Sequence, residues 1–454
     1  MNPSAKQAAS AQQASSARKT ALRALVSCRT NGAWADAALK AQLSRDGLSG
    51  PDAALSSRIV YGVMQNRMLL DFYIGAYCSQ KPDHLQPPLL EILRIGAYQI
   101  LFLDKVPDSA AVNTSVELAK LAKRGQASGL VNAVLRKVSQ NKASLPAIPD
   151  RDAAQFLSIR YSHPKWLVKR LLALLGWEET EAFLAANNCP APVTAQVNTR
   201  WHCTKQVEEA LTAAGVGVEE HPWLSDCLLL SETGNLERLE SFQAGALYIQ
   251  DPAARLAVLG SGVKAGDSVL DVCAAPGGKS FAAAIRMGEQ GSVLACDLHE
   301  NKLKRIREGA ARLKLNNIET AAADGRDFHP EWESRFDVVL VDAPCSGLGI
   351  IRKKPDVRYK KADDLFTLPV IQRSILANAA RYVRPGGTLL YSTCTILPEE
   401  NEQVTDGFLA EYPDFSRESF ALPQPVGEAD GQLTLWPQRH GTDGFYICRM
   451  RRQG

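Results

Sequence analysis

Apolar residues in the first third of the chain recur every three and four positions, which is the spacing of one helical face. This pattern predicts helices over 21–26, 55–64, 89–103, 112–121 and 128–138. Residues 1–17 are mainly Ala, Ser and Gln without an apolar run, so we predict a disordered tail there and no secretory signal. We therefore expect an all-α domain over 18–142, followed by a polar, proline-containing linker over 143–152.

The middle of the chain has a mixed pattern. Helical spacing over 166–175, 178–187 and 207–214 surrounds a strand-like run over 193–199. We predict a small α+β domain over 153–240.

From residue 241 onward, short continuous apolar runs alternate with helical patterns. The runs predict strands over 268–273, 292–296, 318–322, 337–341 and 388–392, and the patterns between several of them predict helices over 278–287, 300–315 and 370–382. Continuous apolar strands that alternate with helices are typical of a parallel sheet covered on both faces. We expect a Rossmann-like α/β domain over 241–454, closed by an antiparallel strand over 446–451.

Composition and charge narrow the class of protein. Of the 454 residues, 45% are hydrophobic and 22% charged, which is ordinary for a globular protein, and no apolar stretch is long enough to predict a membrane helix. Residues 1–150 hold 18 lysines and arginines against 10 aspartates and glutamates, whereas the remainder holds 34 against 39. This excess favours a nucleic-acid partner, although a solvated helical face would look the same. The candidates for phosphate contacts are Lys120, Lys123, Arg124, Arg136 and Lys137.

The ten cysteines form no CxxC pair and no His/Cys cluster at zinc spacing. We therefore expect no metal site and no disulfide framework, and we predict a cytoplasmic enzyme with reduced thiols.

A glycine-rich turn, Asp271-Val-Cys-Ala-Ala-Pro-Gly-Gly-Lys-Ser280, follows one predicted strand and opens a helix. A phosphate-binding P-loop is excluded because position 273 lacks the glycine it needs, and the dinucleotide pattern GxGxxG is absent. Asp297 follows the next strand at the distance suited to ribose hydroxyls, and Asp324 after the third strand can contact an adenine edge. Each aspartate alone could be a helix cap. Together they predict a nucleoside site without a pyrophosphate, which suits S-adenosylmethionine.

Two cysteines follow neighbouring strand candidates. Asp342 and Cys345 lie after the fourth strand and Cys394 after the fifth, so one cleft receives all three if these strands are adjacent. A thiolate that adds to carbon 6 of a pyrimidine makes carbon 5 nucleophilic toward a methyl donor, and a carboxylic acid at N3 stabilises the developing charge. A second thiol can assist product release. The residues alone do not say which thiol does which.

These motifs resemble the RNA cytosine-C5 methyltransferases of the NOL1/NOP2/Sun (Fmu) family, over about residues 190–450. The resemblance rests on Ala274–Lys279, on Asp342-Ala-Pro-Cys345 and on Ser392-Thr-Cys394. It implies that Cys394 is the nucleophile, that Cys345 assists release and that Asp342 also faces the cytosine. The residues it implies for S-adenosylmethionine are Cys273, Ala274, Ala275, Pro276, Gly277, Gly278, Lys279, Asp297, Asp324 and Asp342. Lys279 could also be a solvated lysine.

The N-terminal region resembles the NusB-type RNA-binding domain, over 89–103, 106–120 and 131–136. A NusB-like domain joined to this catalytic domain is similar to bacterial family members that methylate a cytosine in 16S rRNA. The expected fold is multidomain, with an all-α NusB-like domain, a small α+β insertion and a class I methyltransferase domain. We expect a monomer that acts on 16S rRNA, with further RNA contacts from Asn198, Arg200 and Arg352.

Three alternatives remain. The RNA could instead be tRNA or 23S rRNA, or the protein could be a non-catalytic RNA-binding assembly factor. A nicotinamide dehydrogenase is the third, but the chain lacks the glycine pattern that this class needs.

Overall fold

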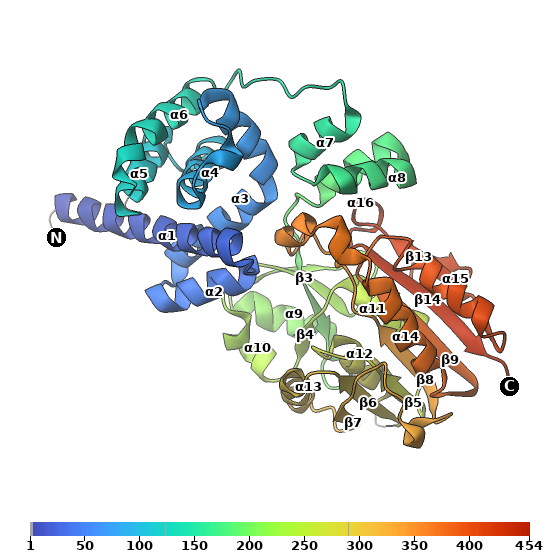
Figure 1. The fold of residues 1–454 in the computed structure, drawn as a ribbon. Coiled ribbons are helices and arrows are strands. Elements are labelled where there is room, and N and C mark those ends of the chain that lie inside the picture. The colour runs from blue at the N-terminus through green and yellow to red at the C-terminus, as the bar shows by residue number, and fades with distance from the viewer. Residues whose placement is uncertain (1–2, 123, 289) are drawn as a thin grey trace. The chain divides into compact units, whose positions relative to one another are not determined.

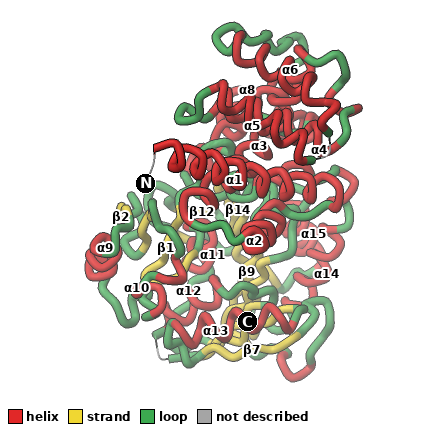
Figure 2. Tube along the Cα trace, turned by 90° about the vertical axis from the view of Figure 1, so that its left-hand side faces the viewer, coloured by secondary structure: helices red, strands yellow, loops and turns green. Residues whose placement is uncertain are grey.

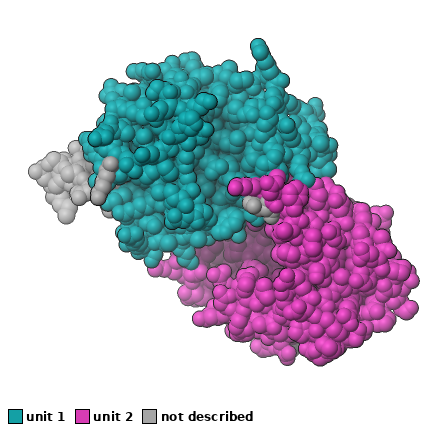
Figure 3. Space-filling view, viewed as in Figure 1, with its two compact units in different colours: residues 1–188, 354–360 teal, residues 189–353, 361–454 magenta. Residues whose placement is uncertain are grey.

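The computed structural model describes residues 3–122, 124–288 and 290–454. The chain forms two compact units (Figure 3), one of residues up to 188 with 354–360 and the other of 189–353 with 361–454. The first unit is helical and the second is α/β (Figure 1). Each is described by itself.

The helical unit is built around one buried helix. Its helices are α1 (Pro3–Asn31), α2 (Ala35–Asp46), α3 (Gly50–Tyr77), α4 (Pro87–Phe102), α5 (Asp108–Leu121), α6 (Ser128–Gln140), α7 (Ala153–Tyr161) and α8 (Lys165–Ala186). In α4, residues 89–100 are all buried, because this helix is apolar on nearly every side. Its Arg94 is paired with Glu91 and Asp71, which neutralise the buried guanidinium.

A short segment from late in the chain also belongs to the helical unit. It contains the 3-10 helix η5 (Pro355–Tyr359). The Asp356 carboxylate accepts a hydrogen bond of 2.8 Å from the Ala35 amide, at the start of α2. The Tyr359 hydroxyl donates to the Met64 carbonyl at 2.8 Å, and the Arg67 guanidinium lies over its ring. Residues 354–360 therefore fill part of the helical unit even though the α/β unit flanks them in sequence.

The α/β unit begins with a four-stranded antiparallel sheet in the order β2-β3-β1-β4. Its strands are β1 (Val193–Val197), β2 (Gly217–Glu220), β3 (Cys227–Ser231) and β4 (Leu247–Ile249), with helices α9 (Thr204–Ala213) and α10 (Glu240–Gln243). Buried Val207 and Leu211 of α9 pack against the apolar face of this sheet.

The main sheet has the order β10-β14-β9-β8-β5-β6-β7, and β13 pairs with β14. Its strands are β5 (Ser268–Asp271), β6 (Ser292–Asp297), β7 (Ile318–Ala322), β8 (Phe336–Asp342), β9 (Val383–Thr393), β10 (Phe415–Arg417), β13 (Gln432–Leu435) and β14 (Phe445–Arg452). The pairs among β5 to β9 are parallel, and β14 runs antiparallel to β9. The predicted parallel sheet and the closing antiparallel strand are confirmed.

Helices cover both faces of this sheet (Figure 2). They are α11 (Pro252–Gly260), α12 (Gly278–Met287) and α13 (Glu300–Arg312) on one face, and α14 (Leu368–Ala380) and α15 (Glu402–Glu411) on the other. Along β8, Val338 and Leu340 face the first group whereas Val339 and Val341 face the second. The remaining short elements are η1 (Pro82–His84), η2 (Gly125–Ala127), η3 (Leu236–Arg238), η4 (Pro330–Trp332), η6 (Ala362–Leu365), β11 (Phe420–Ala421), β12 (Glu428–Ala429) and α16 (Pro437–His440).

The chain divides at a different place from the expected linker. Helices α7 and α8 belong to the helical unit, whose boundary lies after Asn188, and not to the α/β unit. The end of α7 is bonded to α3, because the Ser162 hydroxyl accepts a 3.1 Å hydrogen bond from the Leu69 amide. The N-terminal residues predicted as a disordered tail lie in α1 from Pro3 onward, and residues 1–2 are outside the described part.

Candidate active site

The strand order of the main sheet reverses between β5 and β8, because the chain moves outward from β5 to β6 and β7 and then returns to the other side. Ligands of open α/β sheets bind outside the carboxyl ends of the strands at such a point. The turn after β5, the residues after β8 and the residues after β9 all meet at this edge. The predicted site residues of the α/β domain lie mainly on these segments.

The glycine turn after β5 leads directly into α12. Gly277 has a φ of 110°, and a Cβ there would lie 2.6 Å from the Phe281 ring, so a side chain does not fit. A Cβ at Gly278 would lie 3.0 Å from Gln250 Nε2. Both glycines are therefore needed for close packing at this turn, and the N-terminus of α12 that follows favours an anionic group.

Asp271 ends β5 beneath this turn and is fully buried. Its Oδ2 accepts a 2.7 Å hydrogen bond from the Ser280 hydroxyl. Burial raises the pKa of Asp271 to about 6, against the opposing effects of the Ser280 hydrogen bond and the Lys279 charge. Asp271 therefore supports the turn from inside.

Lys279 and Asp342 form an ion pair across this edge. The Lys279 ammonium lies 2.7 Å from Asp342 Oδ2, and its side chain is only 8% exposed. The Ser392 hydroxyl of β9 donates to the other oxygen of Asp342 at 3.1 Å. Lys279 is therefore not the solvated lysine that the sequence left open.

Asp297 ends β6 and is nearly buried. Its Oδ1 accepts from the His299 amide at 3.1 Å and lies 3.3 Å from the Lys302 ammonium. A carboxylate at the end of the second strand of the sheet is the group expected to bind ribose hydroxyls. A ribose contact of Asp297 stays a prediction.

Asp324 follows β7 and is bound to a neighbouring arginine. Its carboxylate accepts hydrogen bonds from the backbone, Nε and Nη2 of Arg326, and these bonds lower its pKa. Arg326 is therefore a competing partner for the carboxylate assigned to the adenine edge.

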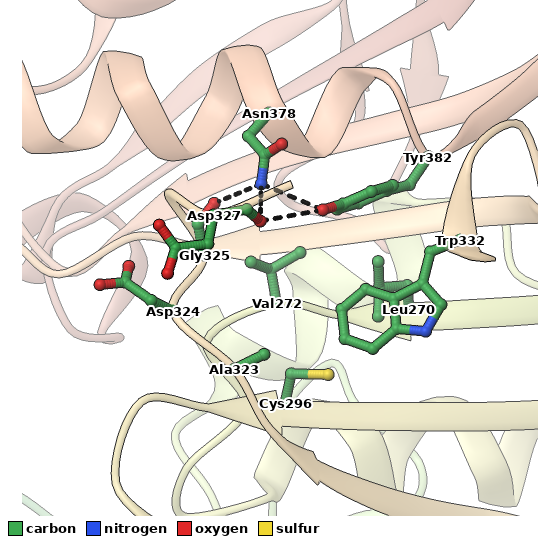
Figure 4. A pocket seen from close by; sticks show the side chains of 10 residues that line it. All are labelled: Leu270, Val272, Cys296, Ala323, Asp324, Gly325, Asp327, Trp332, Asn378 and Tyr382. Atoms are coloured by element: carbon green, nitrogen blue, oxygen red, sulfur yellow. Dashed lines mark hydrogen bonds between the residues drawn. The ribbon is translucent and has the colours of Figure 1, made fainter. Parts of the chain in front are cut away.

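A small cavity lies beside Asp324 (Figure 4). Apolar side chains including Val272, Cys296 and Trp332 line it, and the Asn378 amide closes one side by donating to the carbonyls of Gly325 and Asp327. Its volume of about 10 Å³ is the space of a single water, so an adenine ring does not enter it.

The two cysteines lie at the ends of adjacent strands. The register pairs Asp342 of β8 with Ser392 of β9, which brings the segments that follow these strands together. The Sγ atoms of Cys345 and Cys394 are 3.3 Å apart, and both residues are partly exposed. The sequence predicts that both thiols face one cleft with Asp342 if the two strands are adjacent. The structure shows that β8 and β9 are adjacent.

Three backbone segments pack tightly behind the thiols. The Gly349 amide donates to the Cys394 carbonyl at 3.0 Å, and the Gly444 amide donates to the Gly349 carbonyl at 2.9 Å. A Cβ at Gly349 would lie 1.8 Å from the Gly444 carbonyl oxygen, so only glycine fits. This contact fixes the loop after Cys345 against the residue at the end of β9.

The thiols differ in their surroundings. The hydrogen bond with Cys394, burial and the negative charges of Cys394, Glu400 and Asp342 all raise the pKa of the Cys345 thiol. The surroundings of Cys345 therefore disfavour its thiolate form.

The residues predicted for further RNA contacts are placed less favourably. The Asn198 side chain is fully buried and donates to the carbonyls of Gly245 and Leu313 at 3.1 and 2.9 Å, which leaves no exposed group for RNA. The Arg352 side chain is 9% exposed and donates to the Gly441 carbonyl beside Asp443. The expectation for Asn198 is corrected to a structural role, because buried polar groups need internal partners. The RNA contact of Arg352 stays a prediction. Arg200 stacks its guanidinium on exposed Trp201 and remains a candidate.

The basic candidates of the helical unit are exposed where they are described. Lys120 pairs with Glu117, and Arg136 donates to Asn132 on the same face of α6. Lys123 lies outside the described residues. The candidates that stay exposed are Lys120, Arg124, Arg136 and Lys137.

Sequence reasoning missed two groups near this edge. Lys353 bridges the carboxylates of Asp251 and Asp443, which fastens the loop after Cys345 to the start of α11 and of β14. Glu400 contacts the residue that follows each cysteine. Nothing local identifies either group, because their partners are distant in sequence.

Two absences are limited to the described part of the chain. Within it, no group of three or more His, Cys, Asp or Glu side chains could hold a metal ion. No helix found there has the length and apolar character needed to cross a membrane.

Comparison with known proteins identifies the class. The model described as 16S rRNA methyltransferase RsmB/F matches residues 261–451, the NusB family model matches 15–140, and the RsmF/B-like ferredoxin-like domain matches 163–237. A sheet with this switch point, glycine turn and set of carboxylates is that of an S-adenosylmethionine-dependent methyltransferase.

Curated relatives give the same answer over nearly the whole chain. The probable ribosomal RNA small subunit methyltransferase B of Bacillus subtilis (strain 168) is 38% identical over 447 residues, covering 97% of this chain and 99% of that protein. Ribosomal RNA small subunit methyltransferase B of Vibrio cholerae is 34% identical, covering 88% and 90%. The chain belongs to the 16S rRNA methyltransferase RsmB/F family, and it is an S-adenosylmethionine-dependent rRNA methyltransferase.

Solved structures share the fold. The structure of PH0851 has a TM-score of 0.79 and 27% identity, covering 96% of this chain and 99% of that one. A methyltransferase homologue from Pyrococcus horikoshii has a TM-score of 0.56 and 28% identity, covering 65% and 97%. The NusB-like domain, the small insertion and the α/β methyltransferase domain predicted from the sequence are confirmed.

Proposed function

We propose that this protein transfers a methyl group from S-adenosylmethionine to carbon 5 of a cytosine in 16S rRNA, through a covalent bond between Cys394 and carbon 6. The observation that carries this proposal is the pair of thiols 3.3 Å apart beside Asp342. The names of the relatives, which specify small-subunit rRNA, support the choice of substrate.

The proposed cofactor contacts follow the geometry of the edge. The N-terminus of α12 and the Lys279 ammonium attract the carboxylate of the methionine moiety. Asp297 accepts hydrogen bonds from the ribose. The full set in this proposal is Cys273, Ala274, Ala275, Pro276, Gly277, Gly278, Lys279, Asp297, Asp324 and Asp342. When bound, S-adenosylmethionine supplies an electrophilic sulfonium methyl group to carbon 5 and leaves as S-adenosylhomocysteine.

The first step belongs to Cys394. Its thiolate forms a bond to carbon 6 and the double bond between carbons 5 and 6 opens, which places an electron pair on carbon 5. In its protonated form Asp342 donates a hydrogen bond to N3 of the ring and so stabilises the negative charge that develops there. Lys279 and the Ser392 hydroxyl hold this side chain in place. The target base must leave any stack to reach these groups.

The last step belongs to Cys345. After Cys394 has bonded to carbon 6, Cys345 loses its proton to water, and its thiolate then accepts the proton of methylated carbon 5. The double bond forms again, and the bond from carbon 6 to Cys394 breaks with its electron pair returning to that sulfur. The distance of 3.3 Å between the sulfurs supports the proposal that both act on one ring.

The test uses RNA whose cytosines carry tritium on carbon 5. With S-adenosylmethionine, the full-length protein is expected to release tritium from 16S rRNA, whereas 23S rRNA and tRNA serve as the competing substrates. Absence of release from all three RNAs contradicts the proposed reaction, and release from only tRNA or 23S rRNA contradicts the proposed substrate. The expectations of a monomer and of a cytoplasmic location stay predictions.

A further inference from the structure

Glu400 is a buried carboxylate next to the thiol pair. It lies in the turn between β9 and α15 and is 1% exposed. Its Oε2 accepts hydrogen bonds from the Ser346 amide at 2.8 Å and from Gln372 Nε2 at 3.0 Å, and its Oε1 accepts from the Thr395 hydroxyl at 3.2 Å. All three partners donate hydrogen bonds to Glu400, as an ionised carboxylate requires.

The donors flank both cysteines in sequence. Ser346 follows Cys345, and Thr395 follows Cys394. The hydroxyls of Ser346 and Thr395 also lie 2.6 Å apart, so Ser346 donates to Thr395 while Thr395 donates to Glu400. One carboxylate therefore ties together the two segments that carry the thiols.

Gln372 extends this network to the other side of Cys345. Its Nε2 donates to Glu400 and also to the Pro344 carbonyl at 2.9 Å. The residues before and after Cys345 are thus both fixed through the same side-chain group. Ser346, Thr395 and Gln372 are all fully buried, so water does not compete for these bonds.

A buried charge costs more than a buried amide, and packing alone would not need one here. The charge of Glu400 faces Cys345, together with those of Asp342 and Cys394. Tyr391 also lies close, and its hydroxyl donates to the Glu400 carbonyl at 2.7 Å.

We infer that Glu400 is a positioning residue for the thiol pair, which fixes the distance between the two sulfurs and holds a negative charge beside Cys345. This inference rests on the proposed function. The negative charge of Glu400 is one cause of the raised pKa of Cys345, after the contact with Cys394 and burial. Once the Cys394 sulfur is bonded to carbon, it loses its charge. Cys345 can then release its proton to water and later accept the proton from carbon 5.

The test compares Glu400→Gln with the wild-type protein without RNA. Iodoacetamide labelling of each cysteine is followed by mass spectrometry as a function of pH. Both thiols are partly exposed, so the reagent can reach them. In Glu400→Gln, labelling of Cys345 is expected to begin at lower pH, because a negative charge that disfavours the thiolate is gone. An unchanged pH profile for Cys345 overturns the inference.

Methylation supplies the second readout. In Glu400→Gln, kcat is expected to fall on the order of 10²-fold, because the thiols lose their fixed geometry, while KM for S-adenosylmethionine stays the same. The matched control is Glu411→Gln at the exposed end of α15, for which neither readout should change. A wild-type kcat in Glu400→Gln contradicts the positioning role.

A second variant separates position from charge. Thr395→Val removes the hydroxyl that links Ser346 to Glu400 but keeps the carboxylate. It is expected to lower kcat while the pH profile of Cys345 labelling remains that of the wild type. If Glu400→Gln does not fold, Thr395→Val still tests the inference. An unchanged kcat in Thr395→Val contradicts the positioning role of Glu400. If the wild type releases no tritium, the proposed function is wrong. The labelling experiment needs no RNA, so it tests this inference separately.

Discussion

Lys279 Nζ and Asp342 Oδ2 lie 2.7 Å apart, and this ion pair connects the glycine turn after β5 with the end of β8. The Lys279 side chain is 8% exposed, whereas that of Asp342 is 32% exposed and can reach a substrate. One residue of the predicted cofactor loop therefore also holds the carboxylate assigned to the cytosine.

Replacing Lys279 by Met tests whether this lysine positions Asp342. We expect the methylation rate to fall on the order of 10²-fold, because Asp342 loses the partner that fixes it for charge stabilisation. Rates with saturating S-adenosylmethionine measure this effect. Lys304→Met, on the exposed side of α13, is the control and should retain the wild-type rate. Equal rates in the two variants would show that the ion pair is not used.

The roles of the two thiols predict opposite behaviour of two serine variants. Cys345→Ser should accumulate a covalent complex with RNA, since the adduct forms but is not resolved. Cys394→Ser should form none, because it lacks the nucleophile. Denaturing gel electrophoresis with labelled RNA detects the complex as a slowly migrating band. The reverse pattern would exchange the two assignments.

Asp271 predicts a specific pH dependence of stability. Its pKa is about 6 in the folded protein, against a usual value near 3.8, so the folded state binds this proton more tightly than the unfolded state. The contribution of Asp271 to the free energy of unfolding should therefore be largest below about pH 4. It should fall by on the order of 3 kcal/mol as the pH rises through 6.

Asp271→Asn should abolish that component. Urea unfolding at pH 4, 5, 6 and 7 gives the free energy of unfolding for each variant. Relative to the wild type, Asp271→Asn is expected to become progressively more stable as the pH rises through this range. The exposed Asp363→Asn serves as control and should follow the wild type. A constant difference between Asp271→Asn and the wild type would contradict the assigned shift.

Arg358 predicts a large effect on the helical unit. Its side chain is fully buried, and burial lowers its pKa to about 10. Nη1 donates to Asn188 Oδ1 at 2.9 Å and to the Gln65 carbonyl at 3.1 Å. Arg358→Met leaves these part-buried acceptors without their donor, so we expect a loss of about 2–4 kcal/mol in the free energy of unfolding.

Thermal unfolding of the full-length protein, followed by circular dichroism, measures the effect of Arg358→Met. Lys169→Met on the exposed face of α8 is the control and should change stability by less than about 0.5 kcal/mol. A transition temperature equal to that of Lys169→Met would mean that the 354–360 segment contributes little to the unit.

The basic face of α6 predicts a salt-dependent contribution to RNA binding. Replacing Arg136 and Lys137 together by Ala should weaken binding of 16S rRNA and reduce the slope of log K against log salt by about 1 to 2, because fewer counterions are released. Filter binding over a range of salt concentrations measures this slope. The control replaces Lys40 and Arg45, which are exposed on α2 of the same unit. If both double variants reduce the slope equally, the effect comes from total charge and not from the basic face of α6.

Local patterns located most elements of the fold. The strand predicted over 318–322 coincides with β7, and the helix predicted over 89–103 differs from α4 (Pro87–Phe102) only at its ends. β9 begins at Val383, earlier than the predicted 388. The additional part of the strand includes Pro385, Gly386 and Gly387. These elements were predictable because side chains that face a core must be apolar at the period of the element.

Residues whose role depends on distant partners could not be placed in this way. Asn198 was predicted to contact RNA, but the fold buries it against the Leu313 carbonyl. Arg358 gave no signal in the sequence, although the helical unit encloses it. In each case the acceptors come from segments far away along the chain, and no local spacing records them.

The sequence by itself determined the glycine turn, the carboxylates at the strand ends and the two cysteines, because each depends on a short motif after an apolar strand. Only the tertiary structure decided that β8 and β9 are neighbours, that the sulfurs of Cys345 and Cys394 approach to 3.3 Å, and that Glu400 joins the segments behind them. Strand order and loop packing are set by contacts among side chains distant in sequence. The chemistry of the residues could therefore be predicted, whereas their mutual geometry could not.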